Sequence, residues 1–287
     1  MPGSKNIATG TLWLGCAGCC RSRVAAMDSG DLAHRVIEHW LMPRWMRRLP
    51  RFTPKVDKAT GRPRILRELE QCGVQAGHER IRRSLKRQCL RPVYRRPYRV
   101  TTDSRHAKPV AENVLDRRFD GWATNQAWVA DITYIPTGEG WLYLACVLDL
   151  GSRRIVGWSM NERMKATLVC DALTMAYWRR KPDAGLLMHS DRGVQYASDA
   201  HRKLIKQYRM IQSMSRKANC WDNSVMESFF KTLKVERVHR LQYETRAQAR
   251  LDLVDWMEGF YNSQRLHSSI DYQSPTEFER SLTAAHA

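Results

Sequence analysis

Acidic residues are scarce in this 287-residue sequence, which has 29 Asp and Glu against 48 Lys and Arg. The formal net charge is +19. An excess of this size favours a polyanionic partner, because phosphates that basic side chains neutralise release their condensed counterions. Nucleic acid is the partner that we expect first, and an anionic membrane surface or an RNA scaffold is the alternative.

Long hydrophobic runs are missing as well. The longest apolar stretch near the N-terminus, residues 12–17, is far shorter than the roughly 20 residues that a membrane-spanning helix needs. It is also too short and too weakly flanked for a secretory signal. The sequence therefore predicts a cytoplasmic protein with no membrane partner. Internal repeats and low-complexity tracts are absent, and a hydrophobic fraction of 43% is enough for a packed core.

The cysteines do not form a disulfide framework. Eight of them are scattered along the chain, a pattern typical of free thiols in a reducing compartment. Cys16, Cys19, His34 and His39 have the spacing C-x2-C-x14-H-x4-H, which falls within the range of zinc fingers. The intervening segment has no aromatic residue for the small core of such a finger. We interpret the pattern as chance within an atypical leader, residues 1–50, which we expect to be poorly ordered.

Two short helices are predicted in residues 51–105. Apolar residues at helical spacing mark the first, and they are Ile65, Leu69 and Cys72. Gly73 ends it, Gly77 ends a turn, and a second helix follows from about His78. The apolar side of that helix consists of Ile81, Leu85 and Cys89. Two such helices joined by a glycine-bearing turn resemble a helix-turn-helix.

The second helix and the segment after it are strongly basic. Residues 80–99 contain nine basic residues and no acidic one, with Tyr94 and Tyr98 between them. Pro92 and Pro97 end helical structure, so we expect an extended arm there. The alternative is a solvated helix face followed by a basic linker. The DNA contacts that we expect in this region are Arg80, Arg82, Arg83, Lys86, Arg87, Arg95 and Arg96.

Residues 118–280 have an α/β pattern. Runs rich in β-formers alternate with helical stretches in the order β-β-β-α-β-α-β-α. The predicted strands are 126–135, 141–150, 154–160, 186–189 and 211–215, and the predicted helices are 167–180, 198–208, 222–235 and 248–261. This order is the layout of a ribonuclease-H-like fold. We therefore predict an α/β mixed sheet flanked by helices and preceded by a small all-α helix-turn-helix domain.

Three carboxylates stand out by position. Asp131 lies inside the first strand, Asp191 follows the fourth, and Glu227 lies on the helix after the fifth, with 35 residues between the last two. A charge within an apolar strand is costly unless something compensates it. Oxygen ligands suit Mg²⁺ or Mn²⁺. Two such ions about 4 Å apart can activate the attacking oxygen and stabilise the leaving oxygen of a phosphoryl displacement. We therefore predict these residues to be catalytic metal ligands.

The helix that carries Glu227 has a polar face at helical spacing, formed by Asn223, Glu227, Lys231 and Lys234. Such a face suits a DNA strand that passes the metal ions, and we expect both lysines to contact it. An ordinary amphipathic helix with a Glu–Lys pair is the alternative. In the loop before the helix, Arg216 and Lys217 are expected to contact phosphate.

Four segments in this part of the sequence resemble a known family. They are WVADITYIPTGEGWLYLACVLDLGSRRIVGW, HSDRGVQYAS, SMSRKANCWDNSVMESFFKTLKVE and YNSQRLHSSIDYQSPTEFE. In this order, and with the 35-residue gap, they are similar to insertion-sequence transposases that have a retroviral-integrase-type core with the Asp-Asp-35-Glu signature. The resemblance covers about residues 62–279. It points to the downstream reading-frame products of such elements.

The resemblance implies metal-dependent DNA strand cleavage and strand transfer by a core at residues 118–280. It implies two Mg²⁺ or Mn²⁺ ions, the terminal inverted repeats and target DNA as double-stranded partners, and a homo-oligomer on DNA in the bacterial nucleoid. It also suggests an upstream-frame partner or fusion. Residues 1–50 depart from the family, and Gly151 stands where an aromatic residue is usual.

Two other functions stay open at this point. One is a simple nuclease of the same fold, which the basic helix-turn-helix disfavours. The other is a DNA-binding regulator without catalysis, which the intact carboxylate set disfavours.

Several neighbouring polar residues also have open roles. Asp149 is interpreted as a turn or charge-pairing residue and Asp222 as a helix N-cap. His189 either orients Asp191 or is structural. Trp221 and Asn223 either line the DNA path or cap the helix. Arg265 and His267, in a loop near the end, are further candidates for DNA contact.

Overall fold

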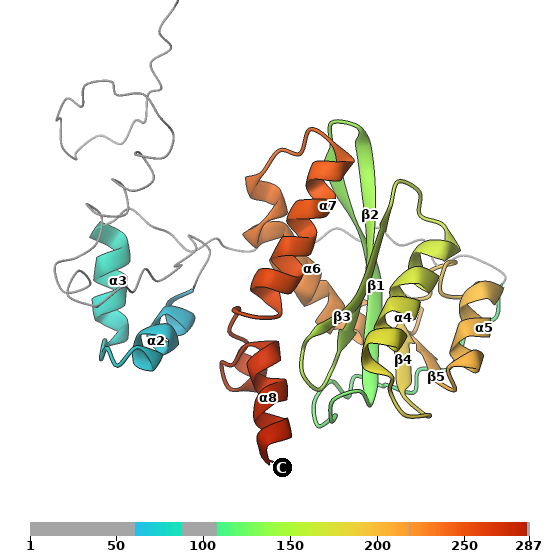
Figure 1. The fold of residues 1–287 in the computed structure, drawn as a ribbon, viewed down its shortest axis with the longest axis horizontal. Coiled ribbons are helices and arrows are strands. Elements are labelled where there is room, and N and C mark those ends of the chain that lie inside the picture. The colour runs from blue at the N-terminus through green and yellow to red at the C-terminus, as the bar shows by residue number, and fades with distance from the viewer. Residues whose placement is uncertain (1–60, 88–107, 218, 286–287) are drawn as a thin grey trace, which may run out of the picture. The chain divides into compact units, whose positions relative to one another are not determined.

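A computed structural model describes residues 61–87, 108–217 and 219–285 (Figure 1). Its first elements are helices α2 (Arg62–Gln71) and α3 (His78–Arg87). Gly73, after the C-cap residue Cys72, adopts the left-handed φ of +72°, and the Val74 N–H donates back to the Leu69 carbonyl. The two predicted helices are thereby confirmed. The predicted basic arm with Arg95 and Arg96, residues 1–50 and the cysteine–histidine pattern lie outside the described residues.

The core is one mixed sheet of five strands in the order β3-β2-β1-β4-β5. β1 pairs antiparallel with β2, and β2 with β3, whereas β4 pairs parallel with β1 and with β5. The strands are β1 (Ala127–Thr137), β2 (Gly140–Asp149), β3 (Ile155–Asn161), β4 (Leu187–Ser190) and β5 (Ile211–Met214). Every predicted strand is confirmed to within two residues at each end.

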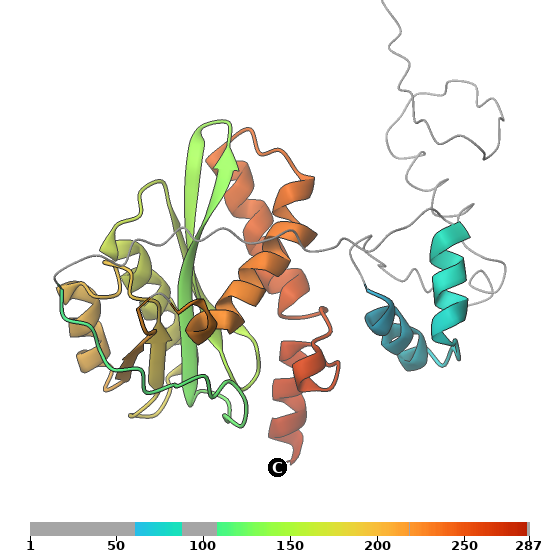
Figure 2. The same cartoon turned by 180° about the vertical axis from the view of Figure 1, so that it is seen from behind.

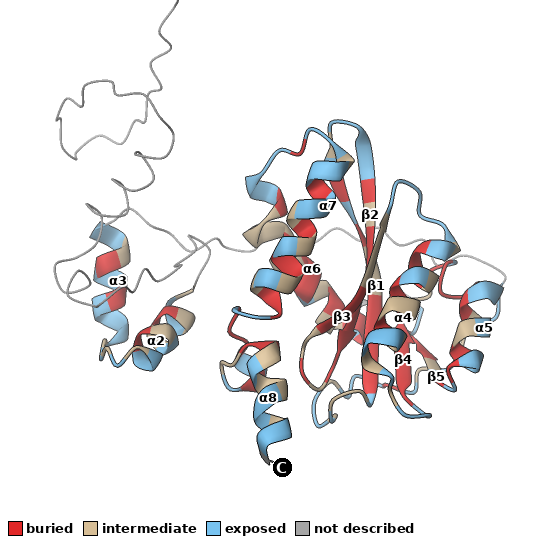
Figure 3. Cartoon of the chain, in the orientation of Figure 1, coloured by how far each residue is buried: buried red, intermediate tan, exposed pale blue. Residues whose placement is uncertain are grey.

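Helices cover both faces of the sheet (Figures 1 and 2). Because side chains of a strand alternate between faces, Trp128 and Ala130 of β1 pack into one cluster with α4 and α5. Val129 and Ile135 pack into the other cluster, with α6 and α7. Burial is greatest along the strands, as Figure 3 shows. The helices are α4 (Ala166–Arg180), α5 (Asp199–Gln207), α6 (Ser224–Glu236), α7 (Arg246–Val254) and α8 (Pro275–Ala285).

Shorter helical turns complete the described chain. The 3-10 turns are η2 (Cys220–Asn223), η3 (Val238–Arg240) and η5 (Ser268–Ile270). The predicted helix 248–261 changes to a π-helix, η4 (Asp255–Tyr261), directly after α7. Just beyond it, the Asn262 amide accepts from the Ile155 N–H at 2.9 Å and donates to the Ile155 carbonyl at 3.0 Å. The π-helix therefore ends next to Asn262, whose side chain hydrogen-bonds to the backbone of the edge strand β3.

The turn after β2 explains the departure at Gly151. A Cβ on Gly151 would lie 2.7 Å from backbone atoms of Ala123 and Thr124, which leaves no room for a side chain. The buried Asp149 carboxylate organises the same turn. It accepts from the Asn125 N–H at 2.6 Å and from the Ser152 N–H at 2.9 Å. Its predicted role as a turn residue is confirmed.

The predicted fold class is confirmed: the core is a ribonuclease-H-like α/β sheet flanked by helices. No helix in the described part of the chain has the length and apolar character to cross a membrane.

Candidate active site

The sheet register brings Asp131 and Asp191 to equivalent positions on neighbouring strands. Parallel pairing of β1 with β4 ends at Ala130 and Ser190, and each of these residues is followed directly by one of the two carboxylates. Adjacent strands lie about 4.8 Å apart. Asp131 and Asp191 therefore lie side by side where the pairing of β1 with β4 ends.

Local hydrogen bonds hold both carboxylates. Asp131 Oδ1 accepts from the Ile132 N–H at 2.7 Å, and Asp191 Oδ1 accepts from the Gly193 N–H at 2.9 Å. A Cβ on Gly193 would lie 2.9 Å from Asp191 Oδ1, so a side chain there would displace the Asp191 carboxylate. The glycine of the HSDRGVQY segment is thus part of the site.

Helix α6 brings Glu227 to the same region. The helix packs against β1. Near its start, Asn223 Nδ2 donates to the carbonyl of Ala130, the residue before Asp131, at 3.3 Å. Glu227 follows Asn223 by one helical turn. Other side chains of α6 are buried in the core, and they are Met226, Phe229, Phe230 and Leu233.

The electrostatics of the site show that the three acids interact. Burial raises the pKa of Asp131 well above its usual range, and the charges of Asp191 and Glu227 raise it further. Burial also raises the pKa of Glu227, against the opposing charge of Lys231. Burial lowers the pKa of Lys234, whose ammonium lies 4.5 Å from the centre of the Tyr134 ring. A cation among these acids would offset both the burial cost and the repulsion.

Two buried oxygen atoms near the acids lack protein partners within the described chain. They are Tyr196 Oη and Asn223 Oδ1. Burial raises the pKa of Tyr196, and the charges of Asp131 and Asp191 add to this, so its phenol stays protonated. Among the described residues, no three His, Cys, Asp or Glu side chains are grouped closely enough to bind one ion. Mg²⁺ in proteins usually takes only one or two carboxylates and keeps several water ligands.

His189 is a structural residue. It is fully buried, with Nδ1 2.8 Å from Ser213 Oγ and Nε2 3.2 Å from Ser215 Oγ. Burial lowers the pKa of His189 to about 4, so its imidazole is neutral near pH 7. These two bonds support the structural role of His189, because they connect β4 to the end of β5.

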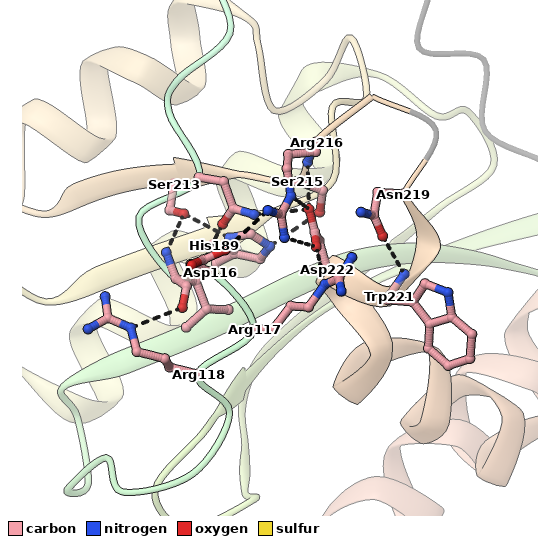
Figure 4. A network of polar contacts seen from close by, with 12 residues as sticks. Asp116, Arg117, Arg118, His189, Ser213, Ser215, Arg216, Asn219, Trp221 and Asp222 are labelled. Atoms are coloured by element: carbon pink, nitrogen blue, oxygen red, sulfur yellow. Dashed lines mark hydrogen bonds and ion pairs between the residues drawn. The ribbon is translucent and has the colours of Figure 1, made fainter.

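The prediction that Asp222 caps a helix is wrong. Asn219 caps the turn η2, and the Asp222 carboxylate is fully buried in a network of polar contacts (Figure 4). It accepts from Arg216 Nε at 3.0 Å and from Arg117 Nε at 2.9 Å. Asn113 Nδ2 donates at 2.9 Å. The arginines hold the pKa of Asp222 well below its usual range.

This network joins the loop before α6 to residues 113–117, upstream of β1. Its upstream members were missed, because they lie in an irregular segment without periodicity. Arg216, expected to contact phosphate, faces Asp222 and also lies 3.2 Å from Asp116. The structure disfavours DNA contact by Arg265, because its guanidinium is buried and lies 2.8 Å from the Glu236 carboxylate. His267 is buried too.

The basic residues expected on DNA are accessible to different degrees. On α3, Arg80, Arg82, Arg83, Lys86 and Arg87 are all exposed. In the core, Lys217 is exposed, and Lys231 and Lys234 are half-buried beside the acids.

Glu79 also belongs to the polar side of α3. It forms ion pairs with Arg82 at 2.7 Å and with Arg83 at 3.2 Å, and these hydrogen bonds lower the pKa of Glu79 to about 2.

Comparison with known proteins gives consistent results. Two family models, both described as an integrase core domain, match residues 123–220 and 208–275. The transposase InsF of insertion sequence IS3A from Escherichia coli K12 is 43% identical over 219 residues, 76% of each chain. An uncharacterized 31 kDa protein of insertion element IS600 from Shigella sonnei is 44% identical, over 76% of this chain and 80% of that protein.

A solved structure of the HTLV-2 integrase catalytic core domain with magnesium covers 55% of this chain and 99% of its own. Its sequence identity is 14% and its TM-score 0.43, too distant a likeness to add to the assignment.

The fold and the matching models define a protein with an integrase core domain. The chain belongs to the insertion-sequence transposases that carry this core, as its identity to the IS3 proteins shows. It is a DNA transposase, a polynucleotidyl transferase of the class named after its Asp-Asp-Glu carboxylates. The predicted family, enzyme class and function are confirmed.

Proposed function

We propose that Asp131, Asp191 and Glu227 hold divalent cations, and that with them this transposase cuts and joins DNA strands at the ends of its mobile element. The observation that carries this proposal is the register of β1 and β4. It sets two carboxylates side by side at a position where burial and mutual repulsion keep the pKa of Asp131 high. Such a pair is costly in an apolar sheet unless a cation compensates it.

The oxygen-only set favours Mg²⁺ or Mn²⁺. Two bound ions would activate the attacking oxygen of water or a 3′-hydroxyl and stabilise the leaving oxygen. The protein residues around them have separate tasks. Lys231 and Lys234, on the same helix as Glu227, offset the negative charge of a phosphate strand. The protonated Tyr196 phenol and Asn223 Oδ1 are free to bond water around the ions, because they are buried without partners in the described chain.

DNA recognition falls to α3 in this proposal. Its five exposed basic residues form a surface that a phosphate backbone can follow. When DNA binds, Arg82 and Arg83 would leave their ion pairs with Glu79 and pair with phosphate groups instead. Lys217, which is exposed in the loop before α6, adds a further proposed contact. Arg95 and Arg96, which lie outside the described residues, complete the proposed set of DNA contacts. The DNA would be the terminal inverted repeats and the target.

We also propose a homo-oligomer on DNA. A mobile element has two ends, and each chain carries one set of three acids, so two ends processed together need at least two copies. Such a complex would be found with the bacterial nucleoid. An upstream-frame partner or fusion would supply further contacts with the ends.

The test is strand transfer with purified protein and labelled duplexes that carry the native element's ends, in Mg²⁺ or Mn²⁺. Glu227→Gln removes one proposed ligand, and Glu162→Gln is the matched control because Glu162 is an exposed glutamate on the β3–α4 connection. Joined products in the wild type and the control, and none in Glu227→Gln, would support the proposal. Joining that survives Glu227→Gln unchanged would overturn it. Cleavage without joining would favour a nuclease, and binding without reaction would require the upstream fusion.

A further inference from the structure

Trp221 leaves 68% of its surface exposed to water. Among the residues that the structure describes, no other aromatic ring lies against its indole. Single exposed apolar side chains are common on protein surfaces, so exposure alone carries no argument. The surroundings of Trp221 set it apart.

The backbone that carries Trp221 is fixed on both sides. Asn219 Oδ1 accepts from the Trp221 N–H at 3.2 Å. On the other side, the buried Asp222 carboxylate is held by Arg216 and Arg117. Figure 4 shows the bonds of Asp222 on one side of Trp221, with the indole pointing away from them. A large flat side chain is therefore presented to solvent from a rigid support, which lowers the entropy lost when a ligand binds it.

This support is anchored at the proposed catalytic site. Asn223, two residues after Trp221, donates to the carbonyl of the residue that precedes Asp131. Glu227 follows one turn later, and the exposed Lys217 lies earlier in the same loop. An aromatic face, a cation and one of the three proposed metal ligands, Glu227, thus come from one short segment.

We propose that Trp221 stacks on a nucleobase of the DNA strand that enters the active site, next to the reacting phosphate. Aromatic side chains that bind single strands stack on bases of any sequence, because every base has a π-face. A base inside a duplex offers no free face, so the terminal pairs must open for this contact. The inference rests on the proposed function, since it assigns Trp221 to the DNA of that site.

The expected effect follows from the worth of such stacking. Stacking of a base on an aromatic ring contributes about 1–3 kcal/mol. Its loss in Trp221→Ala should therefore lower the affinity for an opened end by about 5- to 150-fold. Trp221→Phe keeps a ring and should stay within a few fold of wild type. The salt dependence of binding should not change, because no phosphate contact is lost. Lys217→Ala removes a proposed phosphate contact, so it should make the affinity less dependent on salt concentration.

The experiment measures binding of element-end duplexes whose last pairs are mismatched, as a function of salt. It uses the full chain with Asp131→Asn in the background, so that no DNA is consumed. Trp178→Ala is the matched control, because Trp178 is similarly exposed, at 63%, but lies on α4 across the sheet. In parallel, 5-iodouracil near the reacting phosphate is photo-crosslinked and the crosslinked residue is identified by mass spectrometry.

A 5- to 150-fold loss in Trp221→Ala at an unchanged salt slope, with a crosslink at Trp221, supports the inference. Equal binding by Trp221→Ala and Trp178→Ala overturns it, as does an effect confined to the salt slope. Strand transfer by the protein with native Asp131 separates the two proposals. If that protein joins DNA and Trp221→Ala behaves like Trp178→Ala, only the stacking contact is wrong. If it neither binds nor joins the ends, the proposed function fails first.

Discussion

Replacing Asp222 by Asn should destabilise the core, because this buried carboxylate is the centre of the network before α6. It accepts hydrogen bonds from Arg216, Arg117 and Asn113, and the amide that replaces it would turn N–H groups toward the arginines. Removing one partner of a buried ion pair costs about 3–5 kcal/mol. The two arginine side chains are 46% and 45% exposed and can regain water, so we expect a smaller loss, about 2–3 kcal/mol.

Thermal unfolding measures this loss. For a core of this size, about 2–3 kcal/mol corresponds to a fall in Tm of roughly 5–10 °C at pH 7. Asp199→Asn is the matched control, because Asp199 is an exposed aspartate, 80% accessible, that also pairs with an arginine, and it should leave Tm nearly unchanged.

The effect has a defined pH dependence. The arginines lower the pKa of Asp222 in the folded state, so its stabilisation is present above the ordinary carboxyl pKa of about 4. As the pH falls below that value, the unfolded state takes up the proton first and the advantage of the wild type shrinks. A Tm for Asp222→Asn equal to that of wild type at pH 7 would refute the reasoning. So would a difference that grows in acid.

Three further outcomes are expected. Gly151→Phe, which restores the residue type usual in the family, should destabilise the core by about 3 kcal/mol in urea unfolding, because the new Cβ would lie 2.7 Å from the backbone of Ala123; a stable variant would contradict the close packing. Asp131→Asn should abolish joining in a strand-transfer assay and leave DNA binding within a few fold in a gel-shift assay; loss of both would point to misfolding. Arg87→Ala should reduce the salt slope of binding by about 0.9, and an unchanged slope would remove Arg87 from the phosphate contacts.

The sequence was sufficient for the parts of the fold that depend on periodicity. Strand β1 is rich in β-formers, and the position of Asp131 within it identified a carboxylate that needs compensation. The spacing to Asp191 and Glu227 then indicated a shared site. What spacing could not supply was the pairing of Ala130 with Ser190, which determines that the two aspartates are neighbours.

The contacts that the sequence did not reveal are long-range ones. Asp222 stands just before a helix, where a local rule favours an N-cap, but burial and two arginines from separate segments determine its role. Arg117 lies in an irregular stretch with no period to mark it. Helix α8 was also missed, although Ser274 and Glu277 form a capping box at its start that is readable in the sequence. The π-helical winding of η4 has no such local signal, and it ends next to Asn262, which bonds to β3.

If Asp131, Asp191 and Glu227 hold divalent ions, the full chain must bind Mn²⁺ through them. Binding of Mn²⁺ is measured by electron paramagnetic resonance, with unreactive end DNA present. We predict bound Mn²⁺ in the wild type and in the surface control Glu162→Gln, and a loss of at least tenfold in affinity for Asp131→Asn and Glu227→Gln. Equal Mn²⁺ binding by the wild type and Asp131→Asn would contradict the claim.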